Sequence, residues 1–463
     1  HGAGGHLNAL SELVEATGGK INIDALPVGD KTLSSKEIVG NESQERMGLV
    51  IEEKDIEYVK RIADRERAPL YVVGETTGDD RFVFEQKDGV KPIDLGMADM
   101  FGNSPKTIMT DNTVSVTYDD VQYDAANIDE YLRNVLSLEA VACKDWLTNK
   151  VDRSVTGKIA RQQCQGEIQL PLSDCGVVSL DYRGKAGIAT SIGHAPQVAL
   201  VDSAKGSVMA IAEALTNISM TPIINGIKGI SLSANWMWPC KNAGEDAALY
   251  RAVESCSDFA CALGINIPTG KDSLSMTQKY GEDKVYSPGT VIISAAGEVK
   301  DVRKTVSPVL QPKKSTLYYI DFSSDALKLG GSAFAQSLNK IGSDVPTCTN
   351  PEYFKDAFNA VQTLVNNNLL LAGHDISAGG MIVTLLEMCF ANTEGGIEIE
   401  LDKFGKADLV KILMAENPGV IVQVADNNKT EFKKILDEAG VGYIKLGVPT
   451  DERLIQVKKD GAE

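Results

Sequence analysis

The sequence is poor in the residues that build common metal and nucleophile sites. Only four of its 463 residues are histidines, and its eight cysteines are scattered without a C-x-x-C pair. A zinc site or a disulfide framework is therefore not expected, whereas reduced thiols are. The H-E-x-x-H, G-x-C-x-G and Walker A patterns are also absent, which argues against a metalloprotease, a glutaminase nucleophile or a P-loop in this sequence.

Positive charge and long apolar runs are scarce as well. Lys and Arg number 46 against 64 Asp and Glu, which gives a formal net charge of -18. Proteins that hold nucleic-acid phosphates use clustered basic residues, so no nucleic-acid partner is expected. No apolar run reaches the roughly 18 residues of a membrane-spanning helix, and no leader opens the sequence. We therefore expect a cytoplasmic protein without a membrane partner, and, because the sequence begins at His1 rather than Met, residues upstream of it.

The main organisational feature that is present is an internal repeat. Residues 2–16 read GAGGHLNALSELVEA, and residues 377–391 read SAGGMIVTLLEMCFA. Residues 41–50 have a weaker counterpart in 415–422, in the same order along the sequence. The offset from residue 2 to residue 377 is 375 residues, which is too long for a solenoid and typical of a duplicated multi-domain unit. The alternative is a chance likeness between two glycine-initiated helices.

The alternation of strand-like and helical segments predicts an α/β (α+β) fold with mixed sheets flanked by helices. Residues 1–112 are expected to form a partial α/β domain, 113–152 a connector with a helix over Ile128–Asn149, 153–305 a second domain and 306–463 a third. The predicted strands include Leu70–Val73, Val198–Val201, Val291–Ala295, Thr316–Ile320 and Gly419–Val424. The predicted helices include Ala243–Leu263, Tyr353–Asn367, Asp408–Met414 and Lys429–Ala439.

A hard-metal and nucleotide site is the best chemical candidate. Asp174 ends a loop before the apolar strand Val177–Leu180, and Glu213 and Asn217 are four residues apart in the mostly apolar helix Val208–Ile218. This spacing puts both side chains on one helix face. A buried carboxylate needs a partner, and oxygen ligands suit Mg²⁺ rather than zinc. The alternative is a Glu paired with a nearby Lys and an Asn that faces solvent.

Two further segments have the chemistry of nucleotide contacts. In His374–Gly380, a polar pair precedes a helix start whose backbone N–H groups could cradle phosphate, and Asp375 could reach the phosphate-bound metal. The alternative is an ordinary N-cap by Ser377, with His374 as a core or capping residue. In Thr269–Met276, between two strand-like runs, a Gly, a Lys and a Ser could approach phosphate. The alternative for that segment is a turn with an exposed Lys.

Taken together, several segments resemble the large, single-chain form of the phosphoribosylformylglycinamidine synthase family. The likeness runs from His1 to about Thr450. Its most specific stretches are GNESQERM (40–47), TGKIARQQCQGEIQLPLSDCGVV (156–178), AEALTNI (212–218), LSANWMWP (232–239), GEDAALYRAV (244–253), TGKDSLSM (269–276) and HDISAGG (374–380).

The resemblance implies two tandem copies of a two-domain unit, which form a pseudo-dimer around a barrel built from their first domains. It places residues 1–112 in the second domain of the first copy, 153–305 in the first domain of the second copy and 306–463 in its second domain. An N-terminal part would precede His1 and a glutaminase domain would follow Glu463. The catalytic residues are expected in those parts.

The implied reaction uses ATP to activate the amide oxygen of formylglycinamide ribonucleotide. Ammonia from glutamine then displaces phosphate and leaves the amidine, ADP and phosphate, and Mg²⁺ neutralises the phosphoryl charge. The residues that match the family's Mg²⁺ ligands are Asp174, Glu213, Asn217 and Asp375. The expected nucleotide contacts are Ser173, Gly270, Lys271 and Ser377, with Lys271 replacing an Asn ligand of smaller relatives. The expected substrate contacts are Glu42, Ser43, Gln44 and Ser273.

Two alternatives to a catalytic role remain open from the sequence. The resemblance also implies that the nucleotide of the second copy is a structural ADP, so that this sequence alone would be a non-catalytic scaffold with an ADP·Mg²⁺ site. The sequence could also belong to another member of the same superfamily, such as an aminoimidazole ribonucleotide synthase or a selenophosphate synthase. The stretch LSANWMWP (232–239) and the tandem repeat argue against that second alternative.

Overall fold

The computed structural model describes residues 1–102, 106, 108–144, 146 and 151–461. Within these residues the chain divides into two compact units, His1–Ile108 and Met109–Glu463. Mixed sheets flanked by helices form both, which confirms the predicted α/β class.

The smaller unit is built on a four-stranded sheet with the order β2-β1-β3-β4, in which β1 and β3 are parallel. Phe82 and Phe84 of β3 are fully buried and stack edge to face, with ring centroids 5.2 Å apart. Its strands are β1 (Gly19–Asn22), β2 (Gly74–Thr76), β3 (Arg81–Glu85) and β4 (Ile93–Gly96). Its α-helices are α1 (Gly5–Leu13), α2 (Ser35–Gly40), α3 (Ile56–Arg65) and α4 (Met97–Phe101).

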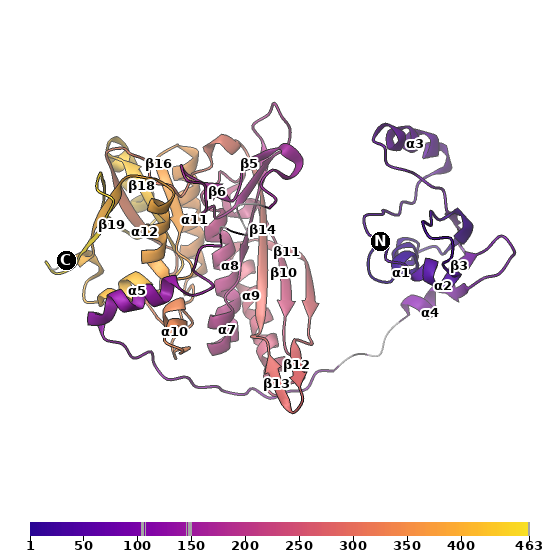
Figure 1. Cartoon of the computed structure of the whole chain (residues 1–463), viewed down its shortest axis with the longest axis horizontal. Helices are drawn as coiled ribbons and strands as arrows, with labels where there is room; N and C mark the ends of the chain where they lie inside the picture. Colours follow the sequence, from indigo (N-terminus) through magenta and orange to yellow (C-terminus); the bar gives the residue numbers. More distant parts are fainter. Residues whose placement is uncertain (103–105, 107, 145, 147–150, 462–463) are drawn as a thin grey trace. The chain divides into compact units, whose positions relative to one another are not determined.

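The first sheet of the larger unit has six strands in the order β11-β10-β14-β9-β8-β5. Burial alternates residue by residue along β9, the pattern of a strand with one face on a core. Helices α8 and α9 supply that core on one face of the sheet (Figure 1). The strands are β5 (Ile159–Arg161), β8 (Gly176–Ser179), β9 (Gly187–Gly193), β10 (Ile230–Met237), β11 (Asn266–Ser273) and β14 (Thr290–Val299). Two small hairpins pair β6 (Cys164–Gln165) with β7 (Leu170–Pro171) and β12 (Thr277–Tyr280) with β13 (Asp283–Tyr286).

The second sheet of the larger unit has the order β16-β18-β15-β19-β17-β20. Its central strands β15 and β18 are buried on both faces, so their sequences read as continuous apolar runs. Tyr318 and Ile320 face the core that contains α11 and α14, whereas Leu317 and Tyr319 face the core that contains α12 and α13. The strands are β15 (Ser315–Asp321), β16 (Leu370–Asp375), β17 (Gly396–Glu400), β18 (Gly419–Ala425), β19 (Tyr443–Thr450) and β20 (Ile455–Lys458).

One hydrophobic core joins the two sheets of the larger unit. Phe259 of α9 and Phe354 of α11 meet edge to face within it, 5.7 Å between ring centroids. The helices are α5 (Ile128–Leu136), α7 (Pro196–Val201), α8 (Ser203–Ile218), α9 (Glu245–Leu263), α10 (Ala333–Ser337), α11 (Pro351–Asn366), α12 (Gly380–Phe390), α13 (Leu409–Met414) and α14 (Lys429–Glu438). Residues at the edge between the two sheets are therefore held in one packed body.

Most of the predicted elements named above are present, and three are wrong. Val198–Val201 belongs to helix α7, because Pro196 at its first position favours a helix start. Leu70–Val73 is irregular and the strand begins at Gly74. Helix α5 ends at Leu136, where the Ser137 hydroxyl donates to the carbonyl of Arg133, rather than at the predicted Asn149. Asn149 itself lies outside the described residues.

Candidate functional site

Three side chains converge at one place where the two sheets of the larger unit meet. His374 Nδ1 lies 2.6 Å from Asp174 Oδ1 and 3.4 Å from Asp375 Oδ1. The other ring nitrogen of His374, Nε2, lies 2.8 Å from Glu387 Oε2 on α12. The side chains of Asp174 and Asp375 are only 5% and 3% exposed. Residues 200 positions apart in sequence thus form one buried polar cluster, as the family resemblance implied for Asp174 and Asp375.

The ends of two strands, one from each sheet, position these residues. Asp174 lies two residues before β8 in the first sheet, and His374 and Asp375 are the last two residues of β16 in the second. Strand β16 is anchored by antiparallel pairing with β18, in which Asp375 is opposite Val420. The cluster therefore depends on correct docking of one sheet against the other.

Helix α8 brings the remaining two predicted metal ligands to the same cluster. The Ser377 hydroxyl donates to Glu213 Oε1 at 2.6 Å. Asn217, one turn further along α8, donates from Nδ2 to the carbonyl of Ile192 at 3.0 Å. The charge of Glu213 is close enough to raise the pKa of Asp375. The four acidic and amide residues predicted from sequence are therefore neighbours.

The electrostatics of the cluster are unfavourable without a cation. Burial raises the pKa of Asp375 well above its usual value, and the Asp174 and Glu213 carboxylates raise it further. Burial also raises the pKa of Glu213, although the hydrogen bond from Ser377 opposes it. For His374, burial lowers the pKa, but Asp174 and Glu387 outweigh burial and hold the pKa well above 6.5. Several buried carboxylates of like charge thus lie close together, and a bound divalent cation would stabilise their ionised forms.

The donor set fits a hard divalent cation. Asp375 Oδ2 is buried without a hydrogen-bond partner among the described residues, whereas Asp174 Oδ1 lies in an ion pair with His374 Nδ1. Buried polar atoms in native proteins normally have one. Ligand atoms of these three residues all lie within 4.8 Å of one another, and carboxylate oxygens are the preferred protein ligands of Mg²⁺.

A small hollow beside Asp174 contains a buried cation, Arg161. Its Nη2 donates to the carbonyl of Thr305 at 2.8 Å and its Nη1 to Gln165 Oε1. Burial lowers the pKa of Arg161, against the nearby negative charge of Asp174. Ser173 lines the same hollow and donates from Oγ to the carbonyl of Gln162 at 2.7 Å. Because Asp174 also lines it, this hollow opens next to the acidic cluster.

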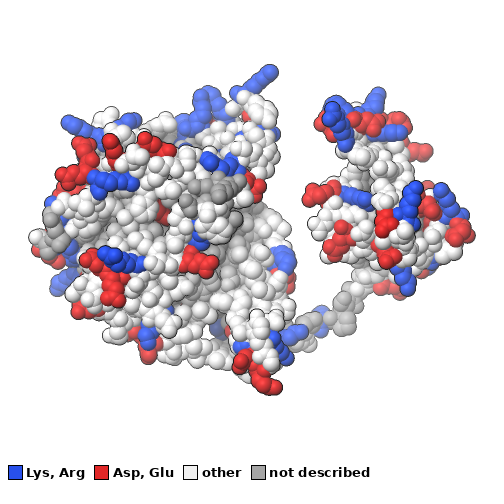
Figure 2. Space-filling model, in the orientation of Figure 1, with Lys and Arg blue, Asp and Glu red and all other residues white. Residues whose placement is uncertain are grey.

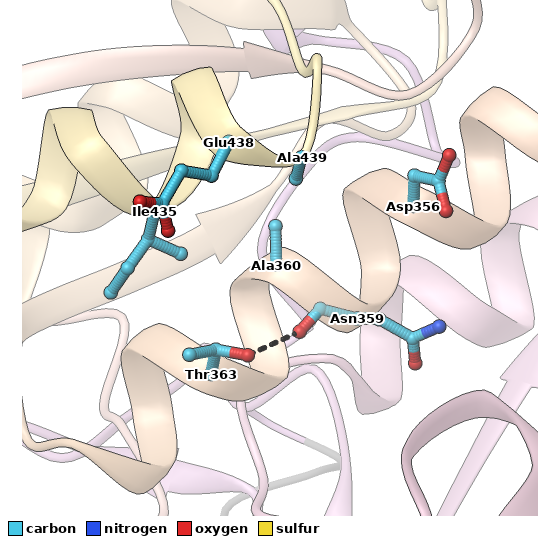
Figure 3. A pocket seen from close by; sticks show the side chains of 7 residues that line it. All are labelled: Asp356, Asn359, Ala360, Thr363, Ile435, Glu438 and Ala439. Carbon is cyan, nitrogen blue, oxygen red and sulfur yellow. Dashed lines mark hydrogen bonds between the residues drawn. The ribbon is translucent and has the colours of Figure 1, made fainter.

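A larger hollow of about 320 Å³ lies between α11 and α14 (Figure 3). The side chains of α11 that line it include Asp356, and the Thr363 hydroxyl there donates to the carbonyl of Asn359 at 3.0 Å. Its remaining lining residues are Ala360, Ile435, Glu438 and Ala439. None of the residues predicted to bind metal or nucleotide lines it, so its size does not make it the candidate site.

The structure does not bring Gly270, Lys271 and Ser273 to the acidic cluster. All three lie within strand β11, not in the turn expected between two strands, and Lys271 Nζ donates to Ser273 Oγ at 2.5 Å. In the strand order, β11 is four steps from β8, which follows Asp174. At a spacing of ~4.8 Å per strand, that separation is roughly 19 Å. The roles of these residues as nucleotide and substrate contacts stay predictions.

Glu42, Ser43 and Gln44 lie in the smaller unit, directly after α2. Backbone hydrogen bonds shape a tight turn, from Ser43 N to the carbonyl of Asn41 and from Gln44 N to that of Glu42, both 2.8 Å. Glu42 and Gln44 are exposed and Ser43 is half-buried. Their role as substrate contacts stays a prediction.

Two N–H groups at the start of α12, where a phosphate cradle was expected, form hydrogen bonds within the chain. Gly379 N donates to Glu416 Oε1 at 2.7 Å, and Gly380 N donates to the carbonyl of Ser377 at 3.0 Å. These two N–H groups are therefore not free for phosphate. Burial raises the pKa of Glu416 to about 7, and the charge of Glu213 adds to that rise.

Sequence reasoning missed four charged residues around the cluster: Arg161, His374 as a cluster member, Glu387 and Glu416. His374 adjoins Asp375, and Glu387 follows Gly379 at the repeat position of Glu12, so both had a signal in sequence. Arg161 lies in the stretch 156–178 and Glu416 in the weak repeat 415–422, but neither pattern indicated that the docking of distant segments would bring them to the cluster.

Curated proteins of one kind match almost the whole chain. The human phosphoribosylformylglycinamidine synthase is 35% identical over 465 residues, which cover 96% of this chain and 34% of that protein. The probable chloroplastic/mitochondrial enzyme of Arabidopsis thaliana is 35% identical over 99% of this chain and 34% of its own length. The chain belongs to the phosphoribosylformylglycinamidine synthase family. It spans about a third of the length of these relatives.

Two domain families match within the chain. The FGAR-AT PurM_N-like domain matches residues 143–298. The C-terminal domain of AIR synthase related proteins matches residues 1–87 and 320–460. The second family thus matches at both ends of the chain, where the two halves of the internal repeat lie.

Solved structures of a family relative share the fold. Thermotoga maritima PurL complexed with ADP is similar over 97% of this chain and 63% of that one, with a TM-score of 0.62 at 16% identity. Its complex with ATP gives a TM-score of 0.59 at 17% identity, over 97% and 62% of the two chains. At this identity the likeness concerns the fold alone.

The helices and the surface charges of the described residues were compared with those of membrane-spanning and nucleic-acid-binding proteins. No described helix is both long and apolar enough to cross a bilayer. On the face drawn in Figure 2, acidic and basic side chains of the described residues are interspersed around largely uncharged surface. That mixture differs from the basic stripe typical of nucleic-acid-binding proteins.

Proposed function

We propose that the chain is part of an ATP-dependent C–N ligase of de novo purine biosynthesis. The whole enzyme converts formylglycinamide ribonucleotide, glutamine and ATP into formylglycinamidine ribonucleotide, ADP, phosphate and glutamate. The names of the curated relatives support this reaction. The observation that carries the proposal is the buried group of Asp174, His374 and Asp375, whose ligand atoms lie within 4.8 Å of one another, with the Glu213 carboxylate close enough to raise the pKa of Asp375.

The acidic cluster is the proposed Mg²⁺ and nucleotide site. Asp174 and Asp375, with Glu213 and Asn217 from α8, would hold Mg²⁺, which neutralises the charge of nucleotide phosphates when bound. Thermotoga maritima PurL has been solved with ATP, with ADP and with FGAR, which supports a nucleotide and a ribonucleotide substrate in this fold. Ser377, through its bond to Glu213, and Ser173, beside Arg161, are the proposed nucleotide contacts.

The remaining assignments extend the proposal to the parts around the site. Residues 153–305 and 306–463 are proposed as the two domains of the second copy, 113–152 as a connector and 1–112 as part of the first copy. Glu42, Ser43 and Gln44 would contact substrate. The catalytic residues and the glutaminase that supplies ammonia would belong to other parts of the enzyme, which acts in the cytoplasm.

Calorimetric titration of the 463-residue chain with ADP tests the site. Binding is expected in the presence of Mg²⁺ and is expected to be lost with EDTA. Asp375→Asn keeps the shape of the side chain but removes a charged ligand, so it should weaken ADP·Mg²⁺ binding about tenfold or more. Asp356→Asn, in the hollow between α11 and α14, is the matched control and should bind as the parent does. Equal binding by Asp375→Asn and the parent would show that the cluster is not the metal site.

A second function, a scaffold with a structural ADP·Mg²⁺, is favoured by the burial of the cluster. Carboxylates only 5% and 3% exposed suit a nucleotide that stays bound better than one that exchanges at each turnover. Glu213→Ala in the full-length enzyme separates the two functions. Loss of turnover in a folded protein indicates a catalytic nucleotide, whereas a lowered melting temperature with normal turnover indicates a structural one.

A further inference from the structure

One carboxylate oxygen outside the metal cluster joins the starts of two helices. Glu416 lies in the loop between α13 and β18, and its Oε1 accepts from Gly379 N at 2.7 Å and from Ala333 N at 2.8 Å. Gly379 is the N-cap residue of α12, and Ala333 is the first residue of α10. A negative group at a helix N-terminus is stabilised by the unpaired N–H groups there. Glu416 supplies that group to both helices.

The turn that Glu416 holds has little conformational preference of its own. Gly379 and Gly380 are both left-handed, with φ of 92° and 74°, and no side chain of α12 caps its start. Glycines populate many backbone conformations, so such a turn needs outside contacts to stay in one of them. The same turn begins at Ser377, two residues after Asp375, and the Ser377 hydroxyl donates to Glu213. The conformation of this turn therefore sets where Ser377 points.

The neighbouring Asn417 forms hydrogen bonds with the segment that leads to α10. Its Oδ1 accepts from Lys328 N at 3.3 Å, and its Nδ2 donates to the carbonyl of Ala326 at 3.0 Å and to Ser323 Oγ at 3.3 Å. Asn417 is 2% exposed. Glu416 and Asn417 together link the two helix starts to strand β18, next to the strand that ends in Asp375.

We propose that Glu416 is a positioning residue of the nucleotide site. Its hydrogen bonds are to the backbone N–H groups of Gly379 and Ala333 and not to the proposed metal ligands or nucleotide contacts. It acts by fixing the Ser377–Gly380 turn, so that Ser377 meets Glu213 and Asp375 is aimed at the metal position. This inference rests on the proposed ADP·Mg²⁺ site and adds to it a residue that acts through the backbone of the Ser377–Gly380 turn.

Three variants of the 463-residue chain test the inference. Glu416→Ala removes the acceptor, Glu416→Gln keeps an acceptor of the same size without charge, and Asn350→Ala is the control. Asn350 likewise accepts two backbone N–H groups, those of Glu352 and Tyr353 at the start of α11, but lies away from the cluster. The measurements are ADP·Mg²⁺ affinity by calorimetry and amide hydrogen exchange of peptides that span residues 376–384.

Glu416→Ala is expected to weaken ADP·Mg²⁺ binding about tenfold and to speed exchange in 376–384. Glu416→Gln should stay within about threefold of the parent, because an amide oxygen can accept both bonds. Asn350→Ala should lower the melting temperature and leave affinity and 376–384 exchange unchanged. If Glu416→Ala does not fold, Glu416→Asp, whose shorter side chain cannot reach both N–H groups, is expected to show the same loss of affinity.

Two failures are distinguishable. A parent chain that binds no ADP·Mg²⁺ overturns the proposed function. A parent that binds, with Glu416→Ala or Glu416→Asp binding equally well or more tightly, overturns the positioning role alone. Affinity lost in Asn350→Ala to the same extent also overturns it, because the effect would then follow from general destabilisation.

Discussion

At the scale of single residues, the ionised forms of the buried carboxylates are electrostatically unfavourable in the folded chain. The pKa values of Asp375, Glu213 and Glu416 are all raised, in each case first by burial. A raised carboxyl pKa means that the folded state favours the protonated group. These side chains therefore favour folding more at low pH than at neutral pH when no cation is bound.

Glu416 gives a pH prediction with a definite sign. Its pKa is about 7 in the folded chain against 4.5 for the free group, so its contribution to stability is present below pH 4.5 and is lost as the pH rises to 7. The loss is on the order of 3 kcal/mol. Glu416→Gln does not titrate, so its stability relative to the parent should improve by that order between about pH 4.5 and 8.

Urea unfolding of the nucleotide-free chain measures this difference. All three tryptophans, Trp146, Trp236 and Trp238, belong to the larger unit, so their fluorescence follows the unit that contains Glu416. A difference between parent and Glu416→Gln that stays constant with pH would contradict the prediction.

At the scale of elements, the two halves of the internal repeat begin their helices in the same way. Helix α1 follows Gly4 and helix α12 follows Gly379, both left-handed, and each first helical residue is again a left-handed Gly. A Cβ on Gly5 would meet the backbone of Gly40 and Asn41, as a Cβ on Gly380 would meet that of Leu413 and Met414. The A-G-G sequence signal thus marks a close backbone contact in both halves of the repeat.

Gly380→Ala should be strongly destabilising for this reason. The new Cβ would lie 2.7 Å from the Met414 carbonyl carbon, in a left-handed backbone where Ala costs about 1–2 kcal/mol by itself. Together, clash and strain are expected to cost about 3 kcal/mol or more. Thermal unfolding followed by tryptophan fluorescence measures the loss.

Gly440→Ala is the control for the backbone term. Gly440 has a φ of 66° and open space around its Cβ position, so only the strain of about 1 kcal/mol applies. Equal losses for Gly380→Ala and Gly440→Ala would mean that the packing of α13 against α12 contributes nothing.

The sequence predicted the helices and central strands where an apolar pattern extended over many residues. The wrong strand predictions came from short apolar runs. The helices α9, α11 and α14 lie within two residues of their predicted bounds, because each runs for ten residues or more. Val198–Val201 offered only four apolar residues, which suit a strand or a helix equally. Pro196, two residues earlier, favours the helix because it occupies the first helical position.

At the scale of the whole molecule, every described member of the acidic cluster lies in Met109–Glu463. Two large cores of that unit also contain no residue from 1–108. A chain of residues 109–463 is therefore expected to fold and to bind ADP·Mg²⁺ within about threefold of the affinity of the 463-residue chain. Calorimetry on the two proteins checks this, and a tenfold weaker truncated chain would mean that residues 1–108 contribute to the site.

The sequence by itself determined the chemistry of this protein: its α/β class, its internal repeat, its family and the acidic residues Asp174, Glu213, Asn217 and Asp375. Side-chain type and periodicity are local properties, so one sequence is enough to read them. The tertiary structure alone decided that Arg161 lies beside Asp174, that Glu416 accepts a hydrogen bond from the start of α12, and that Gly270 lies four strands from β8. Those outcomes depend on which loops meet when the sheets dock, and the packing of distant segments, rather than any local pattern, sets that contact.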